Sequence, residues 1–131
     1  MARRDQFSKE QCSAGLRAAL CIIIKWQASP RQACSILRIS QSTLRRVNQG
    51  RNAGRRLDFD QQERIGLILE IHALLRGIFS DQENVHRFPS LKNDNPFFEG
   101  RSPLEVMSSG DINLIYETFK RIRNLRYLGQ S

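Results

Sequence analysis

The residues best suited to bind a ligand lie between Ser40 and Gly50 and are mostly polar or basic. If residues 41–49 form a helix, Leu44 and Val47 lie three positions apart on its buried side. The opposite side then carries side chains able to hydrogen-bond with base edges or bind phosphates. A helix with Ser40 as N-cap and Gly50 at its end is typical of a recognition helix. Its outward residues are Gln41, Ser42, Arg45, Arg46 and Gln49.

A second short helix is expected just before it, in residues 30–37. Ser29 suits the N-cap, Pro30 suits the first helical position, and Gln32 completes a capping box. The helical pattern then breaks before Ser40, so a tight turn must join the two helices. This arrangement predicts a helix-turn-helix. The apolar residues of the first helix at helical spacing are Ala33, Ile36 and Leu37.

A purely structural interpretation competes with DNA binding, because any helical bundle contains helix pairs joined by short turns. Arg45 and Arg46 would then be part of a solvated face. Two features favour DNA: the small residue Cys34 lies where the helices must approach closely, and apolar residues fall at Ala33, Leu37, Leu44 and Val47. The predicted DNA contacts are Ser40, Gln41, Ser42, Arg45, Arg46, Gln49, Arg51 and Arg55.

The distribution of charge supports this interpretation. The chain has 131 residues and a net charge of +8. Residues 1–57 hold 12 Lys or Arg and 2 acidic residues, whereas residues 58–131 hold 9 and 11. The basic part contains the predicted helix-turn-helix, as attraction to phosphate requires. We therefore predict a DNA-binding region at residues 1–57 and a helical region with another role at residues 58–131.

Composition and motifs exclude several other classes. A chain of this length with 40% hydrophobic residues forms one domain, or two small ones that share a core. No run approaches the roughly 20 apolar residues of a membrane span, and no signal-peptide pattern follows Met1. We therefore expect a cytoplasmic protein without membrane contact. An RNA-binding platform would need exposed aromatic residues, whereas the aromatics here fall at core-like spacings.

Metal binding and catalysis are not expected either. Cys12, Cys21 and Cys34 lack C-x-x-C spacing and are expected to pack as small apolar residues of helices. We expect His72 and His86 to be isolated from each other and from these cysteines. We find no paired acid and base and no activated nucleophile, so we predict no enzyme, no metal site and no cofactor.

Other helices are needed to support the pair, and no strand is expected. The first should begin at Ser8, with Gln11 as its capping partner, and reach Trp26 as a core anchor. The next should begin at Asp60 with Glu63 as its partner. Shorter helices should follow from Ser80 and Ser102, and a last one from Asp111 past Leu125. The apolar face expected for the first helix is Cys12, Leu16, Ala19, Leu20, Ile23 and Ile24.

Ala33-Cys34, Leu37 to Ser40 and Thr43 to Val47 make the helix-turn-helix similar to that of phage-repressor-like regulators. Arg38 stands in the turn where that family usually has Gly, so we expect an altered or strained turn.

The segment from Leu91 to Met107 contains Asn95-Pro96, Phe98, Gly100 and Ser102-Pro103-Leu104-Glu105. In these residues and their spacing it resembles the hallmark of the Xre/MbcA/ParS toxin-binding domain. Ser90 stands where that domain commonly has Trp.

The resemblance implies the antitoxin of a type II toxin–antitoxin pair. Such a protein is a homodimer, represses its operon by binding double-stranded operator DNA, and neutralises a RES-type toxin that consumes NAD. The implied fold is all-α, with a helix-turn-helix half packed against a small helical half that binds toxin or dimerises. The alternative is a stand-alone regulator, carried by a phage or mobile element, whose second half only dimerises or binds another protein.

Phe97 and Phe98 are the bulky apolar residues of the loop before Ser102. One could anchor a partner protein as an aromatic hot spot, or both could close a small core, since exposed apolar groups are uncommon on monomers. Gly100 is expected to supply a backbone conformation that strains other residues, and Pro103 to set the first helical turn. The predicted partner-binding residues are Phe97, Phe98, Gly100, Arg101, Ser102 and Pro103.

Overall fold

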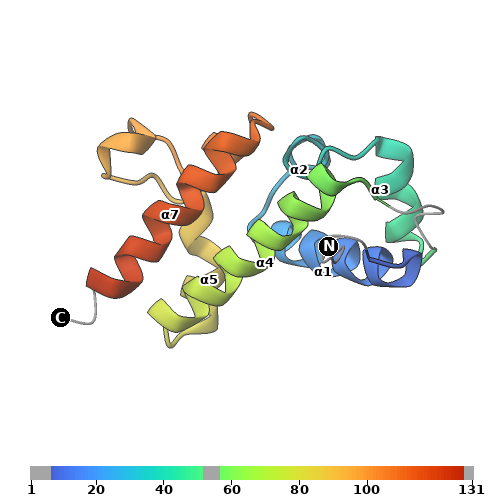
Figure 1. Cartoon of the computed structure of the whole chain (residues 1–131). Helices are drawn as coiled ribbons and strands as arrows, with labels where there is room; N and C mark the ends of the chain where they lie inside the picture. Colours follow the sequence, from blue (N-terminus) through green and yellow to red (C-terminus); the bar gives the residue numbers. More distant parts are fainter. Residues whose placement is uncertain (1–6, 52–56, 129–131) are drawn as a thin grey trace, which may run out of the picture.

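A computed structural model describes residues 7–51 and 57–128, and this part of the chain is helical without any strand (Figure 1). The all-α fold is therefore confirmed, with a helix-turn-helix half packed against C-terminal helices. The helices are α1 (Lys9–Lys25), α2 (Pro30–Leu37), α3 (Gln41–Asn48), α4 (Phe59–Ile78), α5 (Gln82–Arg87), α6 (Pro103–Met107) and α7 (Ile112–Leu128). Two 3-10 turns, η1 (Phe88–Ser90) and η2 (Pro96–Phe98), lie between α5 and α6.

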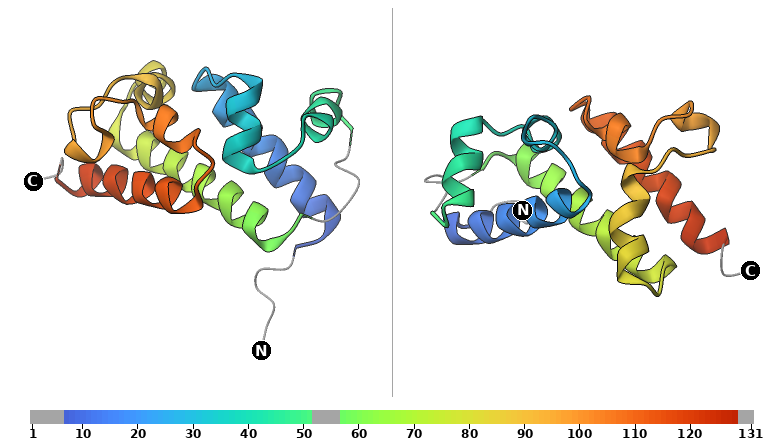
Figure 2. Two further views of the ribbon diagram at one scale, coloured as in Figure 1. Left: turned by 90° about the horizontal axis from the view of Figure 1, so that it is seen from above. Right: turned by 180° about the vertical axis from the view of Figure 1, so that it is seen from behind.

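Helix α4 is the element that both halves share. It lies between α1 on one side and α7 on the other, in all three views (Figures 1 and 2). Its residues Ile68, Ile71 and Leu75 are fully buried, in one hydrophobic cluster with side chains of α1, α2 and α7. Each such side chain contributes roughly 1.5–3 kcal/mol on burial. The two halves are thus held together by a common core rather than by a linker.

The two halves also meet where the turn between α6 and α7 lies against α2. Gly110 in this turn has a φ of +83°. A Cβ atom there would lie 3.1 Å from the carbonyl oxygen of Ser35. Both the left-handed backbone and the close approach therefore favour glycine at this position.

Several helices begin where the sequence places a cap. Ser8, Ser29 and Ser102 each accept a hydrogen bond from the backbone N–H three residues later, and the side chain of that later residue accepts one in return. These reciprocal pairs are capping boxes, each satisfying two backbone donors that the first helical turn leaves unpaired. The predicted starts of α1, α2 and α6 are therefore confirmed.

The predicted starts of α4 and α5 were wrong by one or two residues. Helix α4 is capped by Asp58, with Gln61 as its reciprocal partner, rather than by Asp60 with Glu63. The sequence contains both pairs at the same spacing, and Asp60 instead binds arginines. Helix α5 is capped by Asp81, whose carboxylate accepts from the N–H of Glu83, and not by Ser80.

Two residues expected to pack inward are exposed. Ile24 is 52% exposed, because successive helical residues are about 100° apart and Ile22, Ile23 and Ile24 cannot all face one core. Cys21 is exposed as well, whereas Cys12 is buried and Cys34 is half-buried. Trp26 is fully buried, as a core anchor should be.

None of the described helices has the length and apolar composition needed to cross a bilayer.

A histidine pair connects α4 to α5. The rings of His72 and His86 are stacked, with centroids 6.2 Å apart and planes 5° apart. The expectation that the two histidines are isolated from each other was therefore wrong, because α5 packs on α4 and brings the rings together. Burial lowers the pKa of His72, and repulsion from Arg76, His86 and Lys25 lowers it further. Its Nδ1 atom has no hydrogen-bond partner among the described residues. The fold therefore favours the neutral form of this imidazole.

We expect the free energy of unfolding to fall as the pH drops below about 6.5, the ordinary pKa of histidine. Because the pKa of His72 is lower in the folded state, the unfolded chain binds the proton more readily. The stability that neutral His72 contributes is therefore present above that pH and is lost progressively below it. His72→Gln should flatten this loss in thermal melts from about pH 8 to about pH 5. The control His86→Gln removes the stacked ring and one of three neighbours that repel a charged His72, but it keeps His72 itself and should retain part of the loss. An unchanged pH dependence in His72→Gln would assign the effect to other groups.

Candidate nucleic-acid interface

Helix α3 forms as a separate short helix directly after the turn. The hydroxyl of Ser40 accepts a hydrogen bond from the N–H of Thr43 at 3.0 Å and so caps the helix. Leu44 and Val47 are buried against the core, and Gly50 follows the helix with a φ of +76°. These three features hold one side of α3 against the protein and direct the other side to solvent.

The outward side of α3 is polar and basic, as predicted. Ser42, Arg45, Arg46, Gln49 and Arg51 line one shallow, open hollow. The structure therefore brings together five of the eight residues predicted to contact DNA.

The other three predicted DNA contacts lie elsewhere. Ser40 is exposed at the N-cap, and its hydroxyl also donates to Thr43 Oγ1 at 3.0 Å. Gln41 is exposed but borders a different hollow, beside Cys34 and Arg38. Arg55 lies outside the described residues.

The two arginines of α3 are available for an anionic ligand. Neither Arg45 nor Arg46 forms an ion pair or side-chain hydrogen bond with another described residue. The side chain of Arg51 donates a long hydrogen bond of 3.4 Å to Gln49 Oε1. Phosphate oxygens or base acceptors would satisfy these donors without displacing a protein carboxylate.

Among residues 7–51 and 57–128, no group of three or more His, Cys, Asp or Glu side chains could hold a metal ion.

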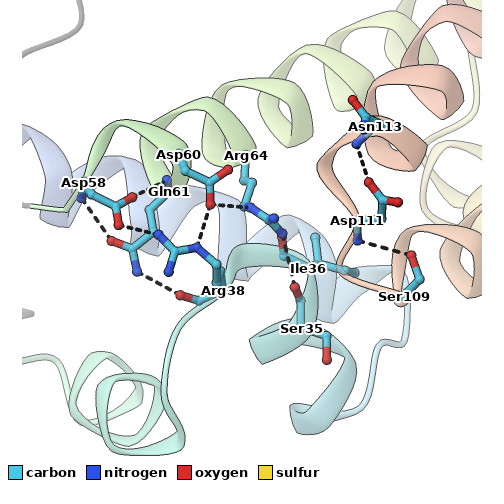
Figure 3. Close-up of polar contacts among 10 residues, drawn as sticks. All are labelled: Ser35, Ile36, Arg38, Asp58, Asp60, Gln61, Arg64, Ser109, Asp111 and Asn113. Carbon is cyan, nitrogen blue, oxygen red and sulfur yellow. Dashed lines mark hydrogen bonds and ion pairs between the residues drawn. The ribbon is translucent and has the colours of Figure 1, made fainter.

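The turn before α3 contains a feature that the sequence pattern did not reveal. Arg38 has φ 56° and ψ 49°, the left-handed conformation that glycine adopts freely and other residues disfavour. Its guanidinium pairs with Asp58 and, at 2.6 Å, with Asp60 (Figure 3). These hydrogen bonds raise the pKa of Arg38, and the bond to Asp58 has the larger effect. Of the altered or strained turn expected at Arg38, the structure shows the strain, because a non-glycine residue holds the left-handed conformation. The two aspartates were missed because they lie 20 and 22 residues away.

Two further side chains of α4 bind the backbone at the end of α2 (Figure 3). Arg64 is 5% exposed and donates to the carbonyl of Ile36 at 3.1 Å, while its Nε binds Asp60 at 3.0 Å. Gln61 donates to the carbonyl of Arg38 at 2.8 Å. The last carbonyls of a helix lack intrahelical donors, so these contacts satisfy groups that α2 leaves unpaired. Only the pairing of Asp60 with Arg64, four residues apart, had a local sequence signal.

The predicted partner-binding residues divide into two groups. Phe98, Ser102 and Pro103 are buried. Direct contact with a partner is not available to these three in this structure, because neighbouring side chains cover them. They shape the segment instead: Ser102 caps α6, and Pro103 opens it.

The second group remains at the surface. Phe97 is partly exposed, meets Phe98 edge to face at 5.0 Å between ring centroids, and carries the guanidinium of Arg121 5.0 Å from its own centroid. Gly100 is exposed with a φ of +81°, as its predicted backbone role requires. Arg101 is exposed, and its Nε donates to the carbonyl of Phe98 at 3.0 Å.

Comparison with known families supports the helix-turn-helix. Residues 13–70 match the model of the antitoxin Xre-like helix-turn-helix domain. The matched stretch begins in α1, contains α2 and α3, and ends within α4. The comparisons with curated proteins and with solved structures gave no match. The family match supports an Xre-like, DNA-binding antitoxin or regulator.

We expect Arg45→Ala and Arg46→Ala each to weaken binding of the cognate duplex, by about 1–3 kcal/mol if the residue contacts a base and by less if it contacts phosphate. Affinity measured against salt should separate the two cases, because loss of one phosphate contact lowers the slope by about 0.9. The control Arg123→Ala removes the same charge from α7, where its guanidinium lies over Phe119, and should bind normally. Unchanged affinity of the double Ala variant would remove this assignment.

Proposed function

We propose that the protein is a DNA-binding antitoxin that represses its own operon and neutralises a RES-type toxin by direct binding. The observation that carries the DNA-binding part is the outward side of α3, where Arg45 and Arg46 have no carboxylate partner among the described residues. This helix lies within the stretch that matches the Xre-like antitoxin domain. Its charge and exposure fit a helix that enters the major groove.

The DNA-binding part is tested with the duplex upstream of the protein's own coding sequence. Fluorescence anisotropy should give tighter binding to this duplex than to a scrambled duplex of equal length and composition. The affinity should fall steeply with salt, because cationic side chains release counterions from DNA. Equal affinity for the two duplexes would contradict sequence-specific repression, even if both bind.

The proposed toxin-binding part rests on the resemblance of residues 91–107 and on the surface around Phe97. Phe97 is the partly exposed aromatic residue of that segment, Arg121 lies over its ring, and the exposed Arg101 binds the carbonyl of the adjacent Phe98. A partly exposed aromatic ring with an arginine over it has the composition of a protein-binding hot spot. A RES-type toxin is the partner that the resemblance implies.

One observation favours the alternative of a stand-alone regulator. Phe98, Ser102 and Pro103 match the toxin-binding pattern, yet they are buried and help to build the fold. Their presence is therefore also explained without any toxin. Co-purification with the product of the adjacent gene separates the two functions. A stable complex with a RES-type neighbour supports the antitoxin, whereas a RES-type neighbour that does not bind, or the absence of one, supports the regulator.

We expect a homodimer at micromolar concentration. One α3 covers too few base pairs for tight operator binding, and two copies about one helical turn of DNA apart are the usual solution. The pairing surface is expected in residues 58–131, where basic and acidic residues nearly balance. Light scattering with and without the upstream duplex would measure the mass, and a monomer under both conditions would contradict this expectation.

Phe97→Ser and the matched variant Phe98→Ser separate partner binding from folding. Phe97→Ser should change the melting temperature little and leave DNA affinity intact, but it should abolish toxin binding and protection of cells that express the toxin. Phe98→Ser should instead lower the free energy of unfolding by about 3–5 kcal/mol or more, because truncation of a buried Phe typically costs that much. Every activity of this variant should be weakened. A folded Phe97→Ser protein that still protects cells would exclude Phe97 from the partner surface.

A further inference from the structure

We propose that Arg38 is a positioning residue for α3, and that it acts through Asp58 and Asp60 at the start of α4. The inference rests on the proposed DNA-binding function. It concerns how the recognition helix is held, whereas Arg45 and Arg46 concern what that helix contacts.

The backbone of Arg38 has an unfavourable conformation, which hydrogen bonds must offset. A left-handed φ of 56° crowds the Cβ atom of any L-residue, so an arginine there is less favourable than a glycine. Both backbone groups of Arg38 are nevertheless used. Its N–H donates to the carbonyl of Cys34, and its carbonyl accepts from Gln61. The turn is thus bonded on one side to α2 and on the other to α4.

The side chain of Arg38 adds a second attachment to α4. Its planar guanidinium binds the two carboxylates through different nitrogens, Nη2 and Nε, which are held in a fixed geometry that a lysine ammonium lacks. Asp60 also binds Arg64, and Arg64 binds the carbonyl of Ile36. A continuous set of polar contacts therefore runs from the last turn of α2 to the first turn of α4 (Figure 3).

This attachment bears on α3 because α3 packs chiefly against α2. Helix α3 starts at Gln41, directly after the turn. A change in the turn would therefore rotate or loosen α3 relative to the rest of the protein. Base contacts need a fixed side-chain geometry, so such a change should weaken specific DNA binding without removing any residue that contacts DNA.

The charges of this network allow a decisive test. Arg38 faces two carboxylates, so its own charge should add little attraction for phosphate. Removing Asp58 and Asp60 makes the protein more positive, and on charge alone this should tighten DNA binding. If Arg38 positions α3, the same change should weaken specific binding. The two explanations thus predict effects of opposite sign.

The experiment compares Arg38→Gly with the double variant Asp58→Asn, Asp60→Ala. Asn retains the ability to cap α4, and Gly relieves the left-handed backbone. Asp60→Ala also removes the carboxylate partner of the buried Arg64, so a thermal melt of each variant first establishes that it is folded at the temperature of the binding assay. The probe is the upstream duplex, measured by anisotropy at two salt concentrations and well below each melting temperature. Both variants should lose affinity on the order of tenfold, the equivalent of one bidentate base contact.

Combining the variants provides a further criterion. Because Arg38 acts through Asp58 and Asp60, its replacement should cost nothing further once they are removed, and the triple variant should bind no more weakly than the aspartate variant. The slope of affinity against salt should stay unchanged in Arg38→Gly. The charge-matched control Arg31→Ala, an exposed arginine of the neighbouring hollow, should keep wild-type specificity. Tighter binding by the aspartate variant, or a reduced salt slope in Arg38→Gly, would mean that Arg38 contacts phosphate and would overturn the proposal.

Hydrogen exchange measured without DNA tests the positioning role of Arg38 independently of the proposed DNA-binding function. The amides of α3 should exchange faster in both variants than in the wild-type protein, while those of α7 should not change. If the wild-type chain binds no duplex, the proposed DNA-binding function fails, but the exchange result still tests the positioning role. Unchanged exchange of α3 in both variants would overturn that role, whatever the DNA measurements give.

Discussion

The structure depends on the attachment of the end of α2 to the start of α4. Helix ends expose carbonyl groups without intrahelical donors, and here Arg64 and Gln61 of α4 supply the donors. The same α4 buries its apolar side against α1 and α7. One helix therefore sets the position of the helix-turn-helix and provides the surface on which the C-terminal helices pack. The orientation of α3 relative to the C-terminal half follows from contacts of α4.

Features encoded within a few residues were predictable from the sequence. Capping boxes need two residues three apart, so the starts of α1, α2 and α6 could be located. The start of α4 was misplaced because two overlapping pairs had the same spacing, and only the arginines that bind Asp60 distinguish them. The contacts of Arg38 were not predictable, because no local rule relates a turn to aspartates 20 residues later.

The same distinction applies to the candidate sites. The outward side of α3 follows from helical periodicity, so most of its residues were placed correctly relative to the core. Phe97 and Phe98 are adjacent, and only tertiary packing decides that Phe98 is the buried one. The boundary at residue 57, the dimer and the toxin partner stay predictions, because they depend on autonomous folding or on surfaces of other molecules.

The position of Gly110 against Ser35 has a consequence for modularity. The turn between α6 and α7 packs so closely on α2 that a methyl group at Gly110 would require Ser35 to shift, so the shape of the helix-turn-helix matches residues far downstream of the matched stretch. A chimera that grafts residues 13–70 onto another C-terminal half would need a glycine at the equivalent turn and a compatible far side of α4. Exchange of DNA-binding specificity between such proteins is therefore simpler by replacing the outward residues of α3 than by recombining whole domains.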